Sequence, residues 1–265
     1  MIDYNWKYYQ LCNCVYRYKL IFIIEGVVEI KSKGYDYFDV EKNLQIAVDD
    51  GKVIRVISYA MSSDVENTLD KIVSRILDRY NRPDLKSLVY TCTKELAING
   101  TKANLKRIFF SENDLDITLA DDYEKGMDLY KSVMREEITL QYGIKAKQQG
   151  LYVKISFLHN DEVLRIEVTN NTGITKQEEN RLREKLKKTM QYDDLMQYYL
   201  DNADDTEGSG MGIALIIILL KGEKIDPNLF RMCINENLTT AKIEIPMSTA
   251  FVSQRDKTNN ESNIT

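Results

Sequence analysis

The chain has 265 residues, 43% of them hydrophobic, and a formal net charge of −5 at pH 7. Its length suits one large domain or two small ones, and its apolar fraction is ordinary for a folded protein. The acidic balance gives no electrostatic basis for binding nucleic acid or an anionic membrane. Four cysteines and one histidine form no recognisable zinc motif, so we expect reduced thiols in a cytoplasmic protein.

The apolar segments are too short to cross a membrane. The run at residues 20–24 is interrupted by Glu25, and the run at 213–220 falls well short of the roughly 20 residues that a spanning helix needs. Residues 1–7 lack the charged and then apolar layout of a signal peptide. We therefore expect no membrane partner.

Residues 1–60 are predicted to form a strand-rich N-terminal module. Residues 19–24 and 27–30 are rich in β-branched and aromatic side chains, which favour strands. Residues 44–57 resemble a hairpin, because two apolar segments flank an Asp-Gly turn. The crowded tyrosines of this module favour an interface, although such side chains more often pack in a core.

A larger domain is predicted over residues 61–248. Apolar side chains at 64–80 recur every three or four positions, which indicates an amphipathic helix, and a second helix is expected from residue 84 to about residue 110. Residues 111–150 then read as a helical insertion with one helix at 123–147. This insertion is either a docking or dimer element, which leaves a homodimer open, or a surface decoration.

The rest of the chain predicts a hairpin at 151–168, a helix at 175–200, and strands at 230–234 and 240–245. The helix at 175 opens with a capping-box pattern. The polar tail at 249–265 is predicted to be disordered. This order of elements predicts an α+β fold, with helices packed on a mostly antiparallel sheet.

The first motif that carries chemistry lies in the second predicted helix. Glu95, Asn99 and Lys102 are spaced by four and three residues, so they share one helix face. Carboxylate and amide oxygens are hard ligands that suit Mg²⁺, and a lysine beside them can neutralise phosphate. The same pattern also fits a solvated polar stripe.

The second motif is a glycine-rich segment before an apolar helix, formed by Gly208, Ser209, Gly210, Met211 and Gly212. Glycines let backbone N–H groups approach a phosphate, and a helix N-terminus adds positive potential. The spacing matches neither a dinucleotide-binding fingerprint nor a P-loop. A flexible hinge before a buried helix would have the same sequence.

In this order, the two motifs resemble those of the GHKL ATP-binding family, which includes gyrase, heat-shock chaperone, histidine kinase and mismatch-repair ATPases. The N box of the family, Glu-x-x-x-Asn-Ala-x-Lys, is similar to residues 95–102, and its second glycine box to 208–213. Its closing strand, Gly-Thr-Thr-x-x-x-x-x-Pro, is similar to 238–246. The resemblance covers about residues 64–247. It implies a two-layer α/β sandwich, with a mixed, mostly antiparallel sheet and helices on one face.

The resemblance implies ATP and Mg²⁺ as cofactors and gives the site residues roles. Asn99 would hold Mg²⁺, Glu95 would activate water or orient the waters of the metal, and Lys102 would touch phosphate. The segment 208–212 would wrap the β- and γ-phosphates, and Thr240 would lie near the adenine.

One box departs from the family pattern Asp-x-Gly-x-Gly, in which the aspartate accepts a hydrogen bond from the adenine amino group. Asn170 stands at the aspartate position here, and Gly173 is the one glycine that remains. An amide oxygen can accept the same hydrogen bond, but without the charge of a carboxylate. We therefore expect Asn170→Asp to tighten nucleotide binding. An ordinary turn would also explain this segment.

The resemblance favours a cytosolic, histidine-kinase-like signalling protein that acts on or through a separate protein partner, as a kinase or an ATPase. The one histidine, His159, falls in a predicted hairpin turn, so we do not expect self-phosphorylation by the histidine route. Two alternatives stay open. The protein is a nucleotide-gated interaction module without phosphotransfer, or it is a scaffold that has lost nucleotide binding.

Overall fold

A computed structural model of the chain describes residues 21–24, 27–31, 37–202, 211–235 and 237–255. Within them, seven strands form a single sheet in the order β2-β1-β3-β4-β5-β7-β6, and each pair of neighbours is antiparallel. The strands are β1 (Ile21–Ile24), β2 (Val27–Lys31), β3 (Ile54–Ser58), β4 (Val153–His159), β5 (Val163–Asn170), β6 (Phe230–Asn235) and β7 (Leu238–Pro246).

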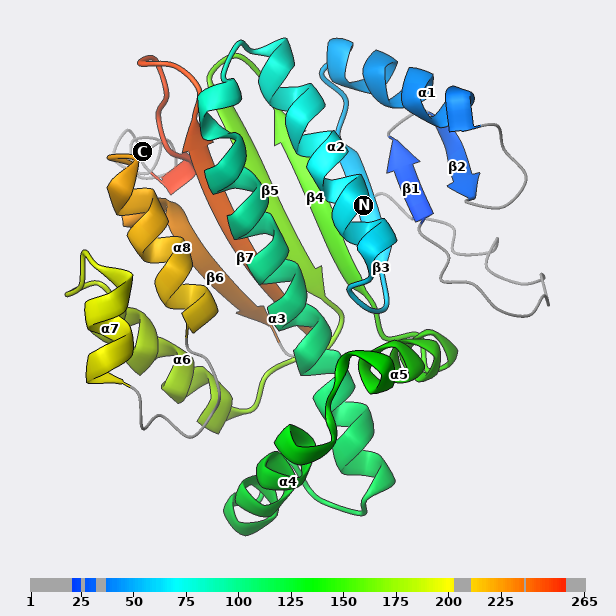
Figure 1. The fold of residues 1–265 in the computed structure, drawn as a ribbon, viewed down its shortest axis with the longest axis vertical. Coiled ribbons are helices and arrows are strands. Elements are labelled where there is room, and N and C mark those ends of the chain that lie inside the picture. Colours follow the sequence, from blue (N-terminus) through cyan, green and yellow to red (C-terminus); the bar gives the residue numbers. More distant parts are fainter. Residues whose placement is uncertain (1–20, 25–26, 32–36, 203–210, 236, 256–265) are drawn as a thin grey trace, which may run out of the picture.

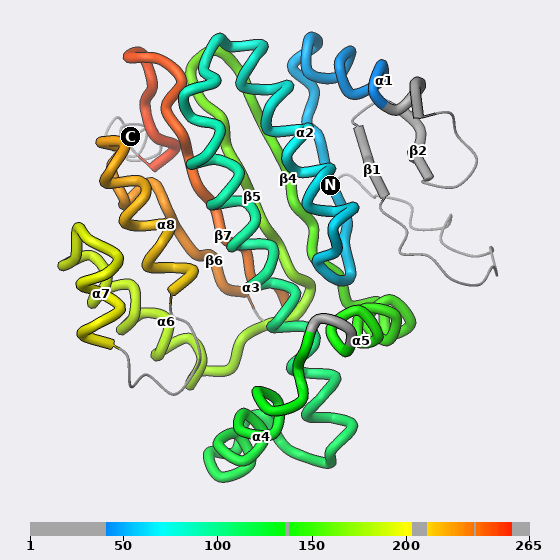
Figure 2. Tube along the Cα trace, in the orientation of Figure 1, coloured from blue at the N-terminus to red at the C-terminus, as the bar shows by residue number. Residues whose placement is uncertain are grey.

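The helices lie over one face of this sheet, with two of them beyond its end (Figure 1). The long helix α3 runs along the sheet and continues past its edge to α4 and α5 (Figure 2). Two short 3-10 turns, Pro83–Leu85 and Pro227–Leu229, precede α3 and β6. The helices are α1 (Tyr37–Asp49), α2 (Ser63–Arg79), α3 (Lys86–Glu112), α4 (Ala120–Val133), α5 (Glu136–Gln148), α6 (Lys176–Thr189), α7 (Leu195–Asp201) and α8 (Met211–Gly222).

Two apolar clusters meet on α3. The main core lies between the sheet and α2, α3 and α8, where Phe157, Ile166 and Ile243 project from the strands. The second cluster joins the outer half of α3 to α4 and α5 through residues such as Phe110 and Tyr142. Each fully buried side chain of this kind contributes roughly 1.5–3 kcal/mol. The helix α3 is therefore held along its whole length, which fixes the direction of its polar face.

The predicted α+β class is confirmed, and the pairings of the described strands are antiparallel rather than mixed. The expected helices at 64–80 and 84–110 and the hairpin at 151–168 are present as α2, α3 and β4–β5. Among the described residues, the structure contains no helix that is long and apolar enough to span a membrane.

The hairpin predicted at residues 44–57 is wrong. Leu44, Ala47 and Val48 are buried on one face of helix α1, because their spacing of three and four suits a helix better than alternation in a strand. Gly51 ends this helix with φ of 64°, and only β3 follows it. The described strands β1, β2 and β3 belong to the same sheet as the later strands, so this sheet includes residues from both sides of the boundary predicted at residue 60. Residues 1–20 of the predicted module lie outside the described residues.

Two predicted helices are each divided in the structure. The helix expected at 123–147 becomes α4 and α5, because Met134 and Arg135 have extended backbone between them. The helix expected at 175–200 becomes α6 and α7, since the side chain of Asp194 accepts a hydrogen bond from the amide of Gln197 and starts a new helix. The predicted capping box between Thr175 and Glu178 is present.

The face of the sheet away from the helices carries charged side chains. Glu244 is fully buried there and binds Arg165 and Arg231, with 2.9 Å to the nearer nitrogen of Arg165. The amide of Gln254 lies 3.4 Å from the same carboxylate. Residues 249–255 of the predicted disordered tail are thus placed against the sheet, whereas 256–265 lie outside the described residues.

Candidate functional site

The two sequence motifs meet between α3 and α8. Glu95 and Asn99 lie half-buried on the face of α3 that meets the start of α8. A Cβ atom added at Gly212 would lie 2.6 Å from Glu95 Oε2 and 3.4 Å from Asn99 Nδ2. Residue 212 is therefore a glycine because the carboxylate of Glu95 takes the space of a side chain, and the carboxylate lies against the first turn of α8.

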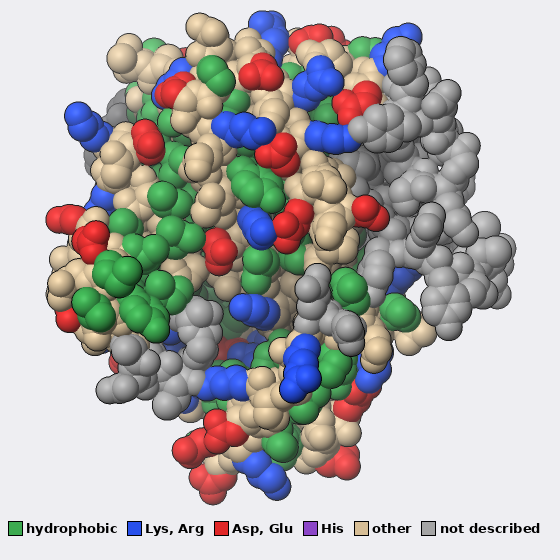
Figure 3. Space-filling model, viewed as in Figure 1, with side chains coloured by type: hydrophobic (Ala, Val, Ile, Leu, Met, Phe, Trp, Pro, Cys, Tyr) green, Lys and Arg blue, Asp and Glu red, His purple; other side chains and the backbone are tan. Residues whose placement is uncertain are grey.

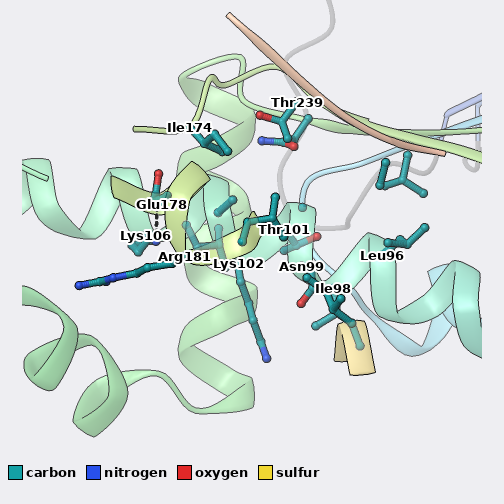
Figure 4. A pocket seen from close by; sticks show the side chains of 18 of the residues that line it. Leu96, Ile98, Asn99, Thr101, Lys102, Lys106, Ile174, Glu178, Arg181 and Thr239 are labelled. Atoms are coloured by element: carbon teal, nitrogen blue, oxygen red, sulfur yellow. Dashed lines mark hydrogen bonds and ion pairs between the residues drawn. The ribbon is translucent and has the colours of Figure 1, made fainter. Parts of the chain in front are cut away.

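A cavity of about 560 Å³ adjoins this contact, between the polar face of α3, the helices α6 and α8, and the strands β5, β7 and β6. Asn99 and Lys102 line it from α3, and Figure 4 shows Lys102 extending away from Thr239 on β7. Its floor is apolar and includes side chains of the sheet and of α8, namely Val168, Ile213, Phe230, Met232 and Ala241. Its size and mixed lining are those of a small-molecule site.

Asn170 lines the cavity at the end of β5 and is only 5% exposed. It pairs in register with Thr239 of β7, which lines the same wall. Gly100 of α3 faces this strand end, where an added Cβ would lie 3.2 Å from Val153 and 3.8 Å from Asn170. A small residue at position 100 thus lets the polar helix approach the strand ends closely.

A chain of hydrogen bonds holds Asn170 in place. Its Nδ2 donates to Thr172 Oγ1 at 2.7 Å, and Thr172 Oγ1 donates to Asn104 Oδ1 at 2.8 Å. Asn104 Nδ2 donates to the carbonyl of Tyr152 at 3.1 Å, and Thr239 Oγ1 donates to the carbonyl of Thr172 at 3.0 Å. Asn104, Thr172 and Thr239 are not among the residues predicted from the sequence, and only the position of Thr239 beside the expected Thr240 offered a signal.

Cationic side chains surround the open part of the cavity (Figure 3). Among the described lining residues, Glu178 is the one carboxylate. The cationic side chains that line the cavity come from α3, α4 and α6 and are Lys102, Lys106, Lys131, Arg181 and Lys185. Of these, Lys102 alone was predicted from the sequence. The excess of positive charge suits an anionic ligand.

Glu178 fastens α6 to α3 at the side of the cavity. It forms ion pairs with Lys106 and with Arg107, the latter at 2.8 Å, and its carboxylate also accepts from the amide of Thr175 at 2.9 Å. Burial raises the pKa of Glu178, but the charges of Lys106 and Arg107 outweigh it and lower the pKa to about 2. The capping box made Glu178 visible in the sequence, whereas its two cationic partners could not be recognised there.

Several predicted site residues lie elsewhere. Thr240 bonds to Thr169 at 3.0 Å on the opposite face of the sheet, because side chains alternate along a strand. Thr240 therefore does not line the cavity, whereas its neighbour Thr239 does. Gly173 does not line the cavity, but its carbonyl accepts from Arg107 at 2.6 Å. Met211 is the first residue of α8 and is half-buried. Gly208, Ser209 and Gly210 lie outside the described residues.

His159 is far from this site. It is the last residue of β4, at the opposite end of the strand from Val153, which pairs with Asn170. Its ring is buried, its Nδ1 lies 3.0 Å from the hydroxyl of Tyr80, and burial lowers its pKa. The imidazole is therefore neutral at pH 7 and held in the body of the protein.

The oxygens of Asn99 and Glu95 could contribute to a Mg²⁺ site only together with ligand oxygens or water. No group of three or more His, Cys, Asp or Glu side chains suited to hold a metal occurs in the described part of the chain. Mg²⁺ characteristically takes one or two protein ligands and completes its shell with waters and phosphate oxygens. The donor set therefore fits a metal that arrives with a phosphorylated ligand.

Comparisons with known proteins give one relative of unassigned role. No family model and no solved structure matches the chain. An "uncharacterized protein" of Treponema pallidum (strain Nichols) is 30% identical over an alignment of 222 residues, and the match covers 80% of this chain and 43% of that protein. The chain thus spans less than half the length of this relative.

Proposed function

We propose that the cavity binds ATP together with Mg²⁺, in a protein of the histidine-kinase-like GHKL type that acts on or through a separate protein partner. The observation that carries the proposal is the contact of Gly212 with Glu95 and Asn99, since it joins the two sequence motifs at the cavity. This contact would not be expected if the polar residues of α3 were only a solvated stripe and the glycines before α8 only a hinge.

At the end of the cavity nearest α8, the residues suit a phosphate chain. Asn99 offers an amide oxygen to a metal, and Glu95 lies close enough to orient the waters of that metal or to activate one of them. Lys102 supplies a positive charge on the same helix face. When bound, Mg²⁺ would neutralise phosphate charge and polarise the phosphoryl group.

At the other end, Asn170 and Thr239 suit a base. Both line the cavity, and the neighbouring Gly100 and Val168 add apolar surface to the same part of its lining. The surrounding cations, among them Lys131 and Lys185, match the negative charge of a nucleotide.

The place of His159 supports an acceptor on another protein. It is buried, bonded to Tyr80, and lies at the end of β4 opposite to the cavity. A phosphoryl group at the cavity would not reach this ring without a large rearrangement. Phosphotransfer, if it takes place, therefore needs a separate acceptor.

The second candidate, a nucleotide-gated interaction module, is favoured by the surface of α7. Met196, Tyr199 and Leu200 are 65%, 51% and 63% exposed on this short helix, and apolar side chains gather over α7 and α8 in Figure 3. Such a patch on the helix that precedes α8 among the described residues suits contact with a protein whose binding depends on the nucleotide.

The first experiment is calorimetric titration of the protein with ATP, with and without Mg²⁺, in parallel with Asn99→Ala. We expect Mg²⁺ to strengthen binding in the original protein and to have no effect in the variant, because the amide oxygen that meets the metal is gone. Gln141→Ala is the matched control, since it removes an exposed amide from helix α5 away from the cavity. Equal Mg²⁺ dependence in Asn99→Ala would refute the metal assignment, and absence of binding in the original protein would refute the proposed function.

Turnover separates the two candidates. A protein of the first kind should transfer the γ-phosphoryl group of labelled ATP to a partner or to water, and Glu95→Gln should abolish this while it preserves ATP binding. A gating module should bind ATP without consuming it.

A further inference from the structure

The hydrogen bonds around Asn170 have a fixed direction. A backbone carbonyl accepts and cannot donate, so the carbonyl of Tyr152 requires the Nδ2 of Asn104 to face it at 3.1 Å. The Oδ1 of Asn104 must then face Thr172, where it can only accept. Asn104 is 2% exposed, so solvent does not offer it an alternative partner.

The same logic continues to Asn170. The hydroxyl of Thr172 has one proton, which it donates to Asn104, so its oxygen is left to accept the Nδ2 of Asn170 at 2.7 Å. The carbonyl of Thr172 accepts from the same Nδ2 at 3.2 Å. Two acceptors therefore hold the NH₂ group of Asn170, and its Oδ1 is the polar atom that remains for a ligand in the cavity.

Thr239, like Asn170, is left with a hydrogen-bond acceptor for the cavity. Its hydroxyl proton goes to the carbonyl of Thr172 at 3.0 Å, which leaves the lone pairs of Oγ1. Thr239 and Asn170 are opposite each other in the pairing of β5 and β7, and both line the cavity. This edge of the cavity therefore offers acceptors only.

We infer that Asn104 and Thr172 are positioning residues that make this edge select a base with an exocyclic amino group over one with an oxo group. Neither residue lines the cavity, and both act through the amide of Asn170. This inference rests on the proposed nucleotide site. An amino group donates to the fixed Oδ1, whereas an oxo group in the same place would set two acceptors against each other and lose about 10- to 100-fold in affinity.

The surroundings of residue 170 also fit an amide better than a carboxylate. An ionised aspartate there would face the carbonyl of Thr172 and a hydroxyl whose proton is already donated to Asn104. On this inference we expect Asn170→Asp to weaken nucleotide binding, whereas the resemblance alone predicts that it tightens it. The hydrogen bonds from Asn170 Nδ2 to Thr172 orient Asn170 Oδ1 toward the cavity. The site therefore presents a fixed acceptor without the charge of a carboxylate.

The test compares ATP with ITP, which carries an oxo group at position 6 of the purine in place of the amino group. We expect the original protein to bind ATP about 10- to 100-fold more tightly than ITP. Thr172→Val removes the shorter of the two bonds to Nδ2 and should lower this ratio by about five- to tenfold, whereas Thr172→Ser keeps the hydroxyl and should keep the ratio. Calorimetry measures each dissociation constant.

The ratio separates positioning from a merely structural role. If Thr172→Val weakens ATP and ITP equally, or if the original protein does not discriminate between them, the inference is overturned while the proposed nucleotide site stands. If the original protein binds neither nucleotide, the proposed function fails and this inference fails with it.

A second measurement needs no ligand. Asn170→Asp should lower the Tm of the protein more at pH 7 than at pH 4, because a protonated carboxyl group can donate to the carbonyl of Thr172 and an ionised one cannot. A Tm difference that is the same at both pH values would contradict the direction assigned to these bonds.

Discussion

The two ends of the cavity are built in different ways. At the proposed base end, hydrogen bonds join Asn170, Thr172 and Asn104 to one another and to the backbone, so the direction of each donor is set without a ligand. At the proposed phosphate end, Glu95 and Asn99 are placed by the packing of α3 against α8. Within the described part of the chain, neither side chain forms a hydrogen bond that would fix its orientation.

This difference assigns a separate property to each end. An edge that is held rigid discriminates between ligands, because a mismatched group meets a donor or acceptor that cannot turn. Side chains held only by packing can adjust to a metal and its waters, so they contribute affinity and metal dependence. Variants at one end should therefore change selectivity, and variants at the other should change the response to Mg²⁺.

The largest effect is expected where α6 is joined to α3, at the side of the cavity. Glu178→Gln leaves Lys106 and Arg107 without their carboxylate and should cost about 3–5 kcal/mol in the free energy of unfolding. Urea denaturation measures this. The neighbouring Glu179→Gln removes the same charge from exposed partners and should cost less than about 1 kcal/mol. Equal losses of stability in the two variants would mean that the buried ion pairs do not hold α6 against α3.

The ion pairs of Glu178 should also be visible as a dependence of stability on pH. The folded protein lowers the pKa of Glu178 from 4.5 to about 2, so the folded state favours the ionised form. This contribution, about 3 kcal/mol, is complete above pH 4.5 and is lost as the pH falls toward 2. The slope of unfolding free energy against pH in this interval should be smaller in Glu178→Gln. An unchanged slope would assign the acid sensitivity to other carboxylates.

The smallest change in stability, and the sharpest distinction between the two ends, is expected from Gly212→Ala. The new Cβ meets Glu95 Oε2, the end of a flexible side chain that can move away, so the cost should stay below about 1 kcal/mol. The displaced carboxylate should nevertheless weaken Mg²⁺-dependent ATP binding by about tenfold. The ratio of ATP to ITP affinity should not change, since the base end is untouched, and a changed ratio would show that the two ends are coupled.

The sequence indicated the phosphate end better than the base end. Glu95, Asn99 and Lys102 lie on one helix, so their spacing alone predicts a common face, and the glycine segment has a recognisable composition. The base end depends on Asn104 from α3, Thr172 after β5 and Thr239 from β7, together with the carbonyl of Tyr152. A backbone carbonyl has no signature in the sequence, and the choice between Thr239 and Thr240 depends on a strand register that only the fold sets.

The fold itself was predictable where the periodicity was long. The helix α2 repeats its apolar side chains over four turns and was recognised, whereas residues 44–48 gave a run too short to separate a helix from a strand. The break between α6 and α7 could be traced afterwards to Asp194, whose capping role competes with a continuous helical pattern.

The most direct test of the central claim is a crystal structure with Mg²⁺ and a non-hydrolysable ATP analogue. We expect Asn99 to be a ligand of the metal, and the phosphates to lie next to the start of α8. We also expect the amino group of the base to donate to Asn170 Oδ1. A nucleotide bound outside the cavity, or a metal held in it without Asn99, would contradict the account.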